Sequence, residues 1–478
     1  MLLLSSITQS NASQARAESH ITELVPIMTV WQYFQKHGVA SRLEQQSSLI
    51  AVNAVAADPS PFSVRSCNGV VVGYTDWLLP GYDQGVMGGV NTARHYASLM
   101  GFGHYDETDG LVKVDSPLLQ DGIVAVYYLP GTLVGALWGG WLGDRYGRIT
   151  TIGIAAVWAV TGTILPCSAQ NANWMFCARV FNGIGTGILN PITPVWATET
   201  ASHTSRGAFV AIEFTLNIFG VVWYFVLWRL DFKLHLEIPI AFQIVPLIGL
   251  LIVVWFTPES PRWLVKVGCN EEARFILGRL RGEHNGIAEA EYHDIKNIVK
   301  LEEDNLQSTS YFTMLFGIKQ GKLHTARRVQ LVVWLQILQE WIDIAGITIY
   351  GPEIFVKNID CYDLSCKASR TDTPQTIAGI AAKDRQWVSG LNNITYMVFP
   401  LQVRAKGNAW GVVGWSIGNG WCVLLLPTIF AALGEKSLYI LGGVSVLAII
   451  VVWALYPETN QCTLEEMNLV FASDSIWE

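Results

Sequence analysis

The sequence predicts an all-α polytopic membrane protein, on three observations. Only 15% of the 478 residues are charged, whereas soluble proteins carry about 25%. The chain contains 43 Gly and 19 Trp; membrane helices use Gly for close packing and concentrate Trp at lipid–water interfaces. Long apolar segments recur along the chain. This composition excludes intrinsic disorder and a small disulfide-rich scaffold.

The apolar segments predict nine clear membrane spans and a weaker one. A helix needs about 20 apolar residues to cross a hydrocarbon core of about 30 Å. The clear candidates are 69–90, 121–143, 150–169, 173–198, 208–228, 238–257, 329–355, 407–432 and 437–456. Segment 387–399 is the weaker candidate, because its helix would cover only about 20 Å. We therefore predict about ten spans.

The spans and one long polar stretch divide the chain into five segments. Basic clusters fall on one side of the membrane if the spans alternate, and the positive-inside rule places that side in the cytoplasm. Asn270–Arg281 has the apolar spacing of an amphipathic helix. The predicted segments are an N-terminal cytoplasmic or non-homologous part (1–66), an N-terminal bundle (69–257), a cytoplasmic linker with short helices (258–328), an incomplete C-terminal bundle (329–456) and a cytoplasmic tail (457–478).

Charge and cysteine content argue against several other classes of protein. The net charge is −8, whereas a nucleic-acid partner requires a basic surface. The eight cysteines are scattered without the spacing of a metal site. The sequence contains no nucleophile–base set and no phosphate-binding loop after a strand. We therefore expect neither an enzyme nor a cofactor.

The loop after the second predicted span has a distinctive pattern of glycines and charges. Glycines let helices approach closely, and Asp and Arg at a membrane edge join helix ends by charge-assisted hydrogen bonds. A basic loop that only fixes topology is the alternative. The residues of the pattern G-x-x-x-D-R-x-G-R are Gly140, Asp144, Arg145, Gly147 and Arg148. With this pattern the chain resembles the sugar porter branch of the major facilitator superfamily, although Ile149 replaces a final Arg.

Further motifs extend this resemblance along the chain. The fourth span and its exit read R-x-x-x-G-x-G-x-G, then P-x-W-x-x-E and R-G, and each half ends in a P-E-S or P-E-T sequence. The charged residues of these motifs, together with the loop that enters the penultimate clear span, are Arg179, Glu199, Arg206, Glu259, Arg262, Arg404 and Glu458. The resemblance implies a major facilitator fold of two helical bundles. It assigns these charges, apart from Arg179, to gating or structural roles.

Asp83 and Arg179 are the candidates for proton coupling. A carboxylate inside a membrane span is costly and by default a functional candidate. The span ends place Arg179 at a similar depth, so we expect the two side chains to pair. In proton-coupled sugar porters the matching Asp carries the proton and the matching Arg tunes it. A static salt bridge between the first and fourth spans is the alternative.

Candidate substrate ligands lie on the seventh and the penultimate clear spans. The sequence of the seventh span resembles the porters' Q-Q-x-x-G-I-N…Y-Y-x-P, in which Gln339 and Tyr350 match and Glu340 replaces the second Gln. Asn419 is a further candidate, with Trp415 and Trp421 nearby. Polar side chains on an aromatic wall suit a sugar. Lipid-facing or packing roles are the alternative for the aromatic residues.

The resemblance implies monosaccharide:proton symport by alternating access, with sugar, protons and the lipid bilayer as partners and the plasma membrane as location. The C-terminal half departs from the family pattern. Porters of this type have twelve spans in all, and this chain has about ten, with the missing spans in the C-terminal half. The polar stretch Val356–Gln375 interrupts this half, and we hypothesise that it is a retained intron. A non-transporting sugar sensor or an inactive truncated paralogue is the alternative function.

Overall fold

The computed structural model describes residues 81–83, 86–87, 90–91, 94–106, 111–201, 216–217, 219–220, 242–281, 286–305, 310–317, 324–341, 399–433 and 437–456. All of them belong to one compact unit, Phe62–Glu478. The predictions for Arg206, Tyr350 and Glu458, for segments 1–66 and 457–478, for segment 387–399 apart from its last residue, and for Val356–Gln375 lie outside the described residues.

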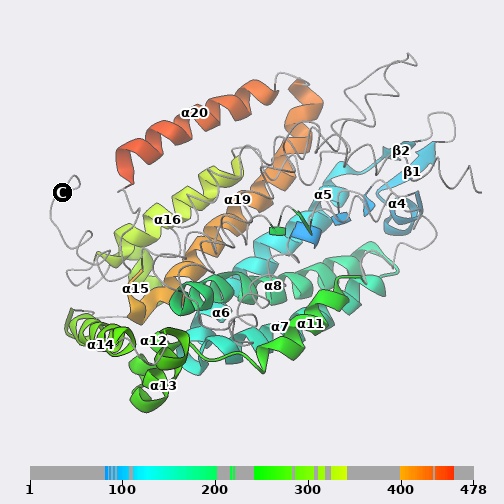
Figure 1. The fold of residues 1–478 in the computed structure, drawn as a ribbon. Helices are drawn as coiled ribbons and strands as arrows, with labels where there is room; N and C mark the ends of the chain where they lie inside the picture. Colours follow the sequence, from blue (N-terminus) through cyan, green and yellow to red (C-terminus); the bar gives the residue numbers. More distant parts are fainter. Residues whose placement is uncertain are drawn as a thin grey trace, which may run out of the picture. The chain divides into compact units, whose positions relative to one another are not determined.

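Helices dominate the described residues (Figure 1). Outside the predicted linker, the helices are α4 (Arg94–Met100), α5 (Pro117–Val126), the π-helix η1 (Tyr127–Thr132), α6 (Leu133–Tyr146), α7 (Arg148–Cys167), α8 (Ala172–Thr200), α11 (Ile244–Val254), α16 (Thr325–Gln339), the short 3-10 helix η4 (Leu401–Val403), α19 (Arg404–Leu433) and α20 (Ser437–Leu455). The linker contains α12 (Pro261–Val267), α13 (Asn270–Arg281), α14 (Ile287–Asn305) and α15 (Tyr311–Phe316).

Three helices in the described part are long and apolar enough to cross a membrane. They are Pro117–Tyr146, which joins α5, η1 and α6, then Arg148–Cys167, and Leu401–Ile429. They correspond to the spans predicted at 121–143, 150–169 and 407–432. Helix α8 has 29 residues, which at about 1.5 Å per residue also suffices in length. The full number of spans depends on segments outside the described residues.

A two-stranded antiparallel hairpin lies between the first two predicted spans, and the sequence analysis did not predict it. Strand β1 (Gly103–Asp106) pairs with β2 (Leu111–Val114), with Gly103 opposite Val114 and Asp106 opposite Leu111. Strands of four residues are too short for a clear alternation of apolar and polar side chains. The Asp109–Gly110 dipeptide is the local signal that could have revealed it.

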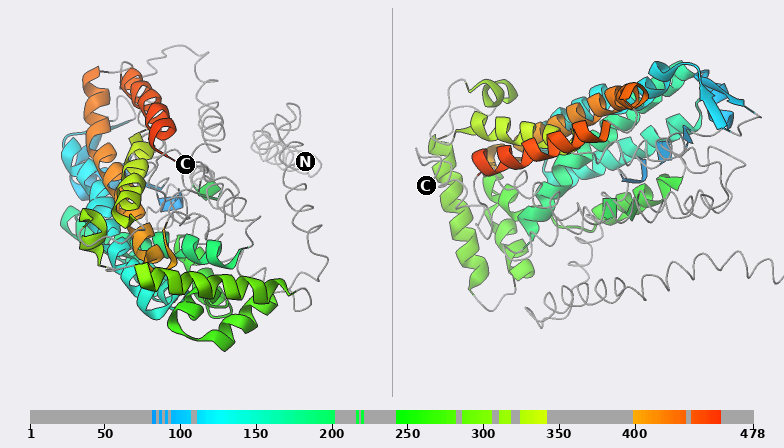
Figure 2. Two further views of the ribbon diagram at one scale, coloured as in Figure 1. Left: turned by 90° about the vertical axis from the view of Figure 1, so that its left-hand side faces the viewer. Right: turned by 90° about the horizontal axis from the view of Figure 1, so that it is seen from above.

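The linker helices form a small cluster of their own. The helix predicted over Asn270–Arg281 is confirmed as α13, and its apolar side chains Ala273, Ile276 and Leu277 are buried. They pack with buried side chains of α12 and α14 in one hydrophobic cluster. Figures 1 and 2 show α12, α13 and α14 gathered at the opposite end of the long helices from the hairpin.

Glycines set the close packing of the second, third and fourth spans. A Cβ atom added at Gly135 would lie 2.3 Å from the carbonyl oxygen of Ile184, and one at Gly187 would lie 2.4 Å from that of Thr132. A Cβ at Gly185 would meet Ala159 Cα on α7 at 2.8 Å. The glycines of the fourth-span motif therefore serve two interfaces, because Gly183 and Gly187 face η1 whereas Gly185 faces α7. Such small-residue contacts let membrane helices approach closely.

We expect Gly187→Ala to destabilise the protein by about 1–3 kcal/mol, because the added methyl group overpacks a backbone contact. A lower thermal unfolding midpoint of the purified protein in detergent would show this. Gly249→Ala on α11 is the matched control, since nothing lies within 4 Å of a Cβ at that position. If both variants unfold at the same temperature, the contact between η1 and α8 is not as tight as the structure has it.

Candidate functional site

Asp83 and Arg179, predicted as partners, lie in contact inside the helical bundle. Arg179 Nη1 on α8 donates to Asp83 Oδ1 at 3.0 Å, and the two residues are only 5% and 3% exposed. Gln243 Nε2 donates to the same oxygen at 3.0 Å. Asp83 Oδ2 is buried and has no hydrogen-bond partner among the described residues. One carboxylate oxygen is thus held twice while the other is left to accept a proton or a further donor.

Gln243 was missed by the sequence analysis. It immediately precedes α11 and lies within the predicted span 238–257. A long polar side chain inside an apolar span is the signal that could have identified it, because such residues usually face the bundle interior. Its amide donates to Asp83 without adding charge, so it orients the carboxylate and leaves Arg179 as the cation of the pair.

A break in the second span lies beside this pair. The helix changes to a π-helix over Tyr127–Thr132, which contains Pro130. Proline lacks the N–H of a regular helical bond, and π-helices are frequent at functional sites. The guanidinium of Arg179 lies 4.7 Å from the centre of the Tyr127 ring, a cation–π distance. The π-helix thus presents an aromatic face to the cation that binds Asp83.

Helix α19 meets the second span next to this break. Tyr128 and Trp415 pack edge to face with ring centres 5.5 Å apart. The hydroxyl oxygens of Thr132 and Ser416 lie 2.6 Å apart, within hydrogen-bond distance. These contacts connect a helix of the predicted N-terminal bundle with one of the predicted C-terminal bundle in the middle of both helices.

The predicted substrate ligands on α16 and α19 lie close to this contact. Glu340 and Asn419 are 3% and 0% exposed, and their side chains form a hydrogen bond. Asn419 Nδ2 also donates to the Trp415 carbonyl oxygen at 3.0 Å. Gln339 is buried, and both Gln339 Oε1 and Asn419 Oδ1 have no partner among the described residues. Buried polar atoms are normally paired, so these oxygens suit a ligand that donates hydrogen bonds.

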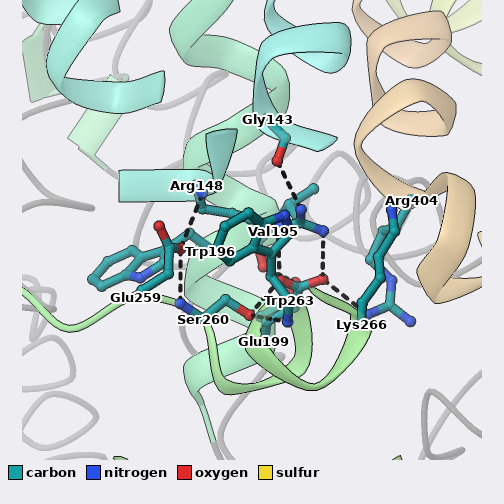
Figure 3. Close-up of polar contacts among 12 residues, drawn as sticks. Gly143, Arg148, Val195, Trp196, Glu199, Glu259, Ser260, Trp263, Lys266 and Arg404 are labelled. Carbon is teal, nitrogen blue, oxygen red and sulfur yellow. Dashed lines mark hydrogen bonds and ion pairs between the residues drawn. The ribbon is translucent and has the colours of Figure 1, made fainter. Parts of the chain in front are cut away.

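A second group of charges surrounds Glu199 at the end of α8 (Figure 3). Glu199 is 1% exposed. Its carboxylate accepts from Arg148 Nε at 3.0 Å, from Arg404 Nη1 at 3.1 Å and from Ser260 Oγ at 2.7 Å. We call Glu199, Arg148, Arg404, Ser260 and Glu259 the Glu199 cluster. Because Arg404 lies on α19 and Arg148 on α7, the cluster joins the two predicted bundles.

Glu259 binds the start of α7 within this cluster. Its carboxylate accepts from the backbone N–H groups of Arg148 at 3.0 Å and Ile149 at 3.1 Å, at a helix N-terminus that favours anions. Burial raises the pKa of Glu259, although these hydrogen bonds favour its ionised form. Gly147 has φ +95, and a Cβ there would lie 2.4 Å from Glu259 Oε2. Position 147 therefore requires glycine for conformation and for space.

Asp144 forms a related set of contacts with basic residues from the linker and α19. Lys266 Nζ lies 3.3 Å from Asp144 Oδ1, and Lys406 Nζ lies 3.8 Å from Asp144 Oδ2. Lys266 also donates to the carbonyl oxygen of Gln402 at 2.9 Å. Burial lowers the pKa of Lys266, and Asp144 opposes that shift. These contacts add to the connection that the Glu199 cluster makes.

The structure separates the predicted motif residues into different environments. Asp144, Arg148, Glu199, Glu259 and Arg404 lie together, whereas Arg145 is exposed and faces the rings of Trp141 and Tyr146. Arg262 pairs with Glu291 on α14 at 3.7 Å. A Cβ at Gly140 would meet the Tyr311 hydroxyl at 2.4 Å, so this glycine admits α15. Ser260, Lys266 and Lys406 were missed, because none belongs to the charged positions of the motifs.

Comparisons with known proteins agree with this geometry. A family model described as sugar (and other) transporter matches residues 70–363 and 389–471. The MFS-type transporter oryC of Aspergillus oryzae is 26% identical over 84% of this chain and 73% of its own length. The arabinose-proton symporter of Bacillus subtilis is 29% identical over 50% of this chain and 51% of its own length. A structure of the proton:xylose symporter XylE bound to 6-bromo-6-deoxy-D-glucose has a TM-score of 0.67 and 20% identity, covering 85% of this chain and 99% of XylE.

The family model covers well over half of the chain, and the structural likeness shows the fold. Both confirm the predicted all-α membrane fold and the predicted resemblance, and they indicate a transporter rather than an enzyme. The chain therefore belongs to the sugar (and other) transporter family, as a multi-pass membrane protein with the major facilitator fold.

Proposed function

We propose that this protein carries a monosaccharide and a proton together across the membrane by alternating access. The buried Asp83–Arg179 pair is the observation on which proton coupling rests. Protonation of the free Asp83 Oδ2 neutralises the carboxylate and weakens its bond to Arg179. Arg179 keeps a partner in the Tyr127 ring. The pair can thus open without leaving an unstabilised cation in the bundle.

The sugar is proposed to bind where the two bundles meet. Gln339 Oε1 and Asn419 Oδ1 supply free acceptors, and Tyr128 with Trp415 supplies aromatic faces. This combination of oriented polar groups on an aromatic wall suits a polyhydroxylated ring. Arabinose and xylose, the sugars that give two similar symporters their names, support a monosaccharide as the cargo.

The Glu199 cluster is proposed to close the cytoplasmic end of the transport path. Its Arg404–Glu199 bond of 3.1 Å and the Lys406–Asp144 pair of 3.8 Å both connect α19 to the N-terminal bundle. Opening at this end must break both, while closing restores them. We propose that segment 258–328 is a cytoplasmic linker, that the lipid bilayer surrounds the bundles 69–257 and 329–456, and that the protein resides in the plasma membrane.

Uptake into proteoliposomes tests the proposed function. Vesicles that contain the purified protein at neutral internal pH are diluted into acidic buffer with a panel of radiolabelled hexoses and pentoses. We expect one or more sugars to accumulate above the external concentration, and a protonophore to abolish the accumulation. Uptake that only equilibrates and ignores the protonophore would contradict symport. No uptake of any sugar would favour the non-transporting sensor or the inactive paralogue.

A further inference from the structure

The carboxylate of Glu340 belongs to the proposed sugar site, and no basic side chain of the described residues forms an ion pair with it. It is 3% exposed, and the Asn419 side chain interacts with it. A Cβ at Gly418 would lie 3.0 Å from Glu340 Cβ and Cγ, so the base of the side chain is held tightly against α19. None of the ion pairs among the described residues includes Glu340. Within the part of the chain that the structure describes, the seventh span thus presents an acid without a basic partner at a fixed place.

Two buried acceptor atoms belong to neighbours of this acid, to Gln339 in the sequence and to Asn419 on the adjoining helix. Gln339 Oε1 precedes it on α16, Asn419 Oδ1 lies beside it on α19, and neither has a partner among the described residues. The Asn419 amide donates one N–H to the Trp415 carbonyl oxygen. A buried carboxylate that lacks a cation is unstable unless a proton or a positive ligand reaches it. The described part of the site therefore offers acceptor atoms beside a buried acid.

We propose that this site selects a sugar that carries a protonated primary amine. An ammonium group offers three donors and no acceptor, which matches the carboxylate of Glu340 and the two free amide oxygens. A neutral hydroxyl offers one donor and no charge. The Trp415 and Tyr128 rings lie at the same contact and supply an apolar face for the sugar ring. This inference rests on the proposed sugar transport through the same site.

The competing chemistry is a proton on Glu340 itself. A neutral carboxyl group would donate to one of the amide oxygens and would bind neutral sugars as a Gln does. The two cases predict different selectivity. An ionised Glu340 prefers an amino sugar to its N-acetylated form, whereas a protonated Glu340 does not, because acetylation removes the charge and leaves most of the ring unchanged.

Direct binding measurements on the purified full-length protein separate these cases. Radiolabelled D-glucosamine, N-acetyl-D-glucosamine and D-glucose are compared near pH 6, where the amine is protonated. We expect glucosamine to bind about tenfold or more tightly than N-acetylglucosamine, because a buried charge pair forms only with the amine. Glu340→Gln, which keeps the shape of the side chain, is expected to lower this affinity ratio by about tenfold or more.

Glu303→Gln is the matched control, since Glu303 is an exposed acid on α14, and its affinity ratio should equal that of the unaltered protein. Equal affinities for glucosamine and N-acetylglucosamine, or a ratio that survives Glu340→Gln, would overturn the inference. If glucose binds without any preference for the amine, only this inference fails. If none of the three sugars binds and the uptake panel is also negative, the proposed function fails with it.

Discussion

Asp83→Asn is expected to abolish sugar accumulation driven by a pH gradient. Vesicles with this variant should take up only as much sugar as vesicles with the unaltered protein do when the internal and external pH are equal. Asn has the shape of a protonated Asp and still accepts from Arg179 and Gln243, which both bind Asp83 Oδ1. It cannot release a proton. The variant should therefore exchange labelled for unlabelled sugar across the membrane without responding to a pH gradient. Uptake and exchange assays on the same vesicles measure both properties.

The control for this variant is Asp294→Asn, which changes an exposed acid on α14 and should leave accumulation intact. Asp83→Asn proteoliposomes that still concentrate sugar would show that another group carries the proton. Loss of exchange together with a much lower unfolding temperature would instead favour the static salt bridge. Breaking a buried ion pair by removing one partner typically costs about 3–5 kcal/mol, and the Tyr127 ring beneath Arg179 limits this cost.

Glu199→Ala is expected to open the end of the bundle that the Glu199 cluster closes. Arg148 and Arg404 are 0% and 2% exposed, and both lose their shared carboxylate. Removing the acid from such a buried ion pair costs about 3–5 kcal/mol. States in which α19 moves away and water reaches the arginines relieve this cost. The population of the open state should rise by about tenfold for each 1.4 kcal/mol relieved.

Labelling of a single cysteine measures this opening. Ala405 is fully buried on α19, and a Cβ added at Gly143 would lie 3.7 Å from its side chain. We place Ala405→Cys in a chain whose eight cysteines are replaced by serine, and follow its reaction with a polar maleimide. Glu199→Ala should accelerate labelling strongly. Glu289→Ala is the control, because it removes an exposed pair with Arg274, and such pairs contribute at most about 1 kcal/mol.

Unchanged labelling in Glu199→Ala would mean that the cluster does not hold this end closed. Lys266 and Lys406 on Asp144 would then be the residues that hold it. The double variant Glu199→Ala with Asp144→Asn distinguishes a shared role from independent ones, because the effects of independent sites add.

The sequence predicted those parts of the fold in which a residue pattern repeats along the chain. The apolar spacing of Asn270–Arg281 gave the bounds of α13, and the high Gly content predicted close packing of membrane helices, because a missing Cβ has the same consequence in any such helix. The hairpin β1–β2 and the π-helix at Pro130 were missed. Each depends on a few residues whose backbone geometry has no period.

Within the candidate site, sequence identified charged residues better than it identified their partners. Asp83 and Arg179 were predicted to pair because the span ends place them at a similar depth in the membrane, and their side chains lie in contact. The loop motif did not reveal that Arg148 turns inward while Arg145 lies on Trp141, because two arginines three positions apart on neighbouring helix ends face different sides. Gln243 and Ser260 were not predicted, because the role of a neutral side chain can be inferred only once the acceptor that it binds is known.

The bond between Glu199 and Arg404 also has a consequence for biosynthesis. The two residues are 205 positions apart in the chain, so the ribosome completes α8 long before α19 emerges. During that interval a lone buried carboxylate would be costly. Arg148 and Ser260 precede Arg404 in the sequence, and both already bind Glu199. The first bundle can therefore insert into the membrane with its acid satisfied, and Arg404 joins an arrangement that is already assembled.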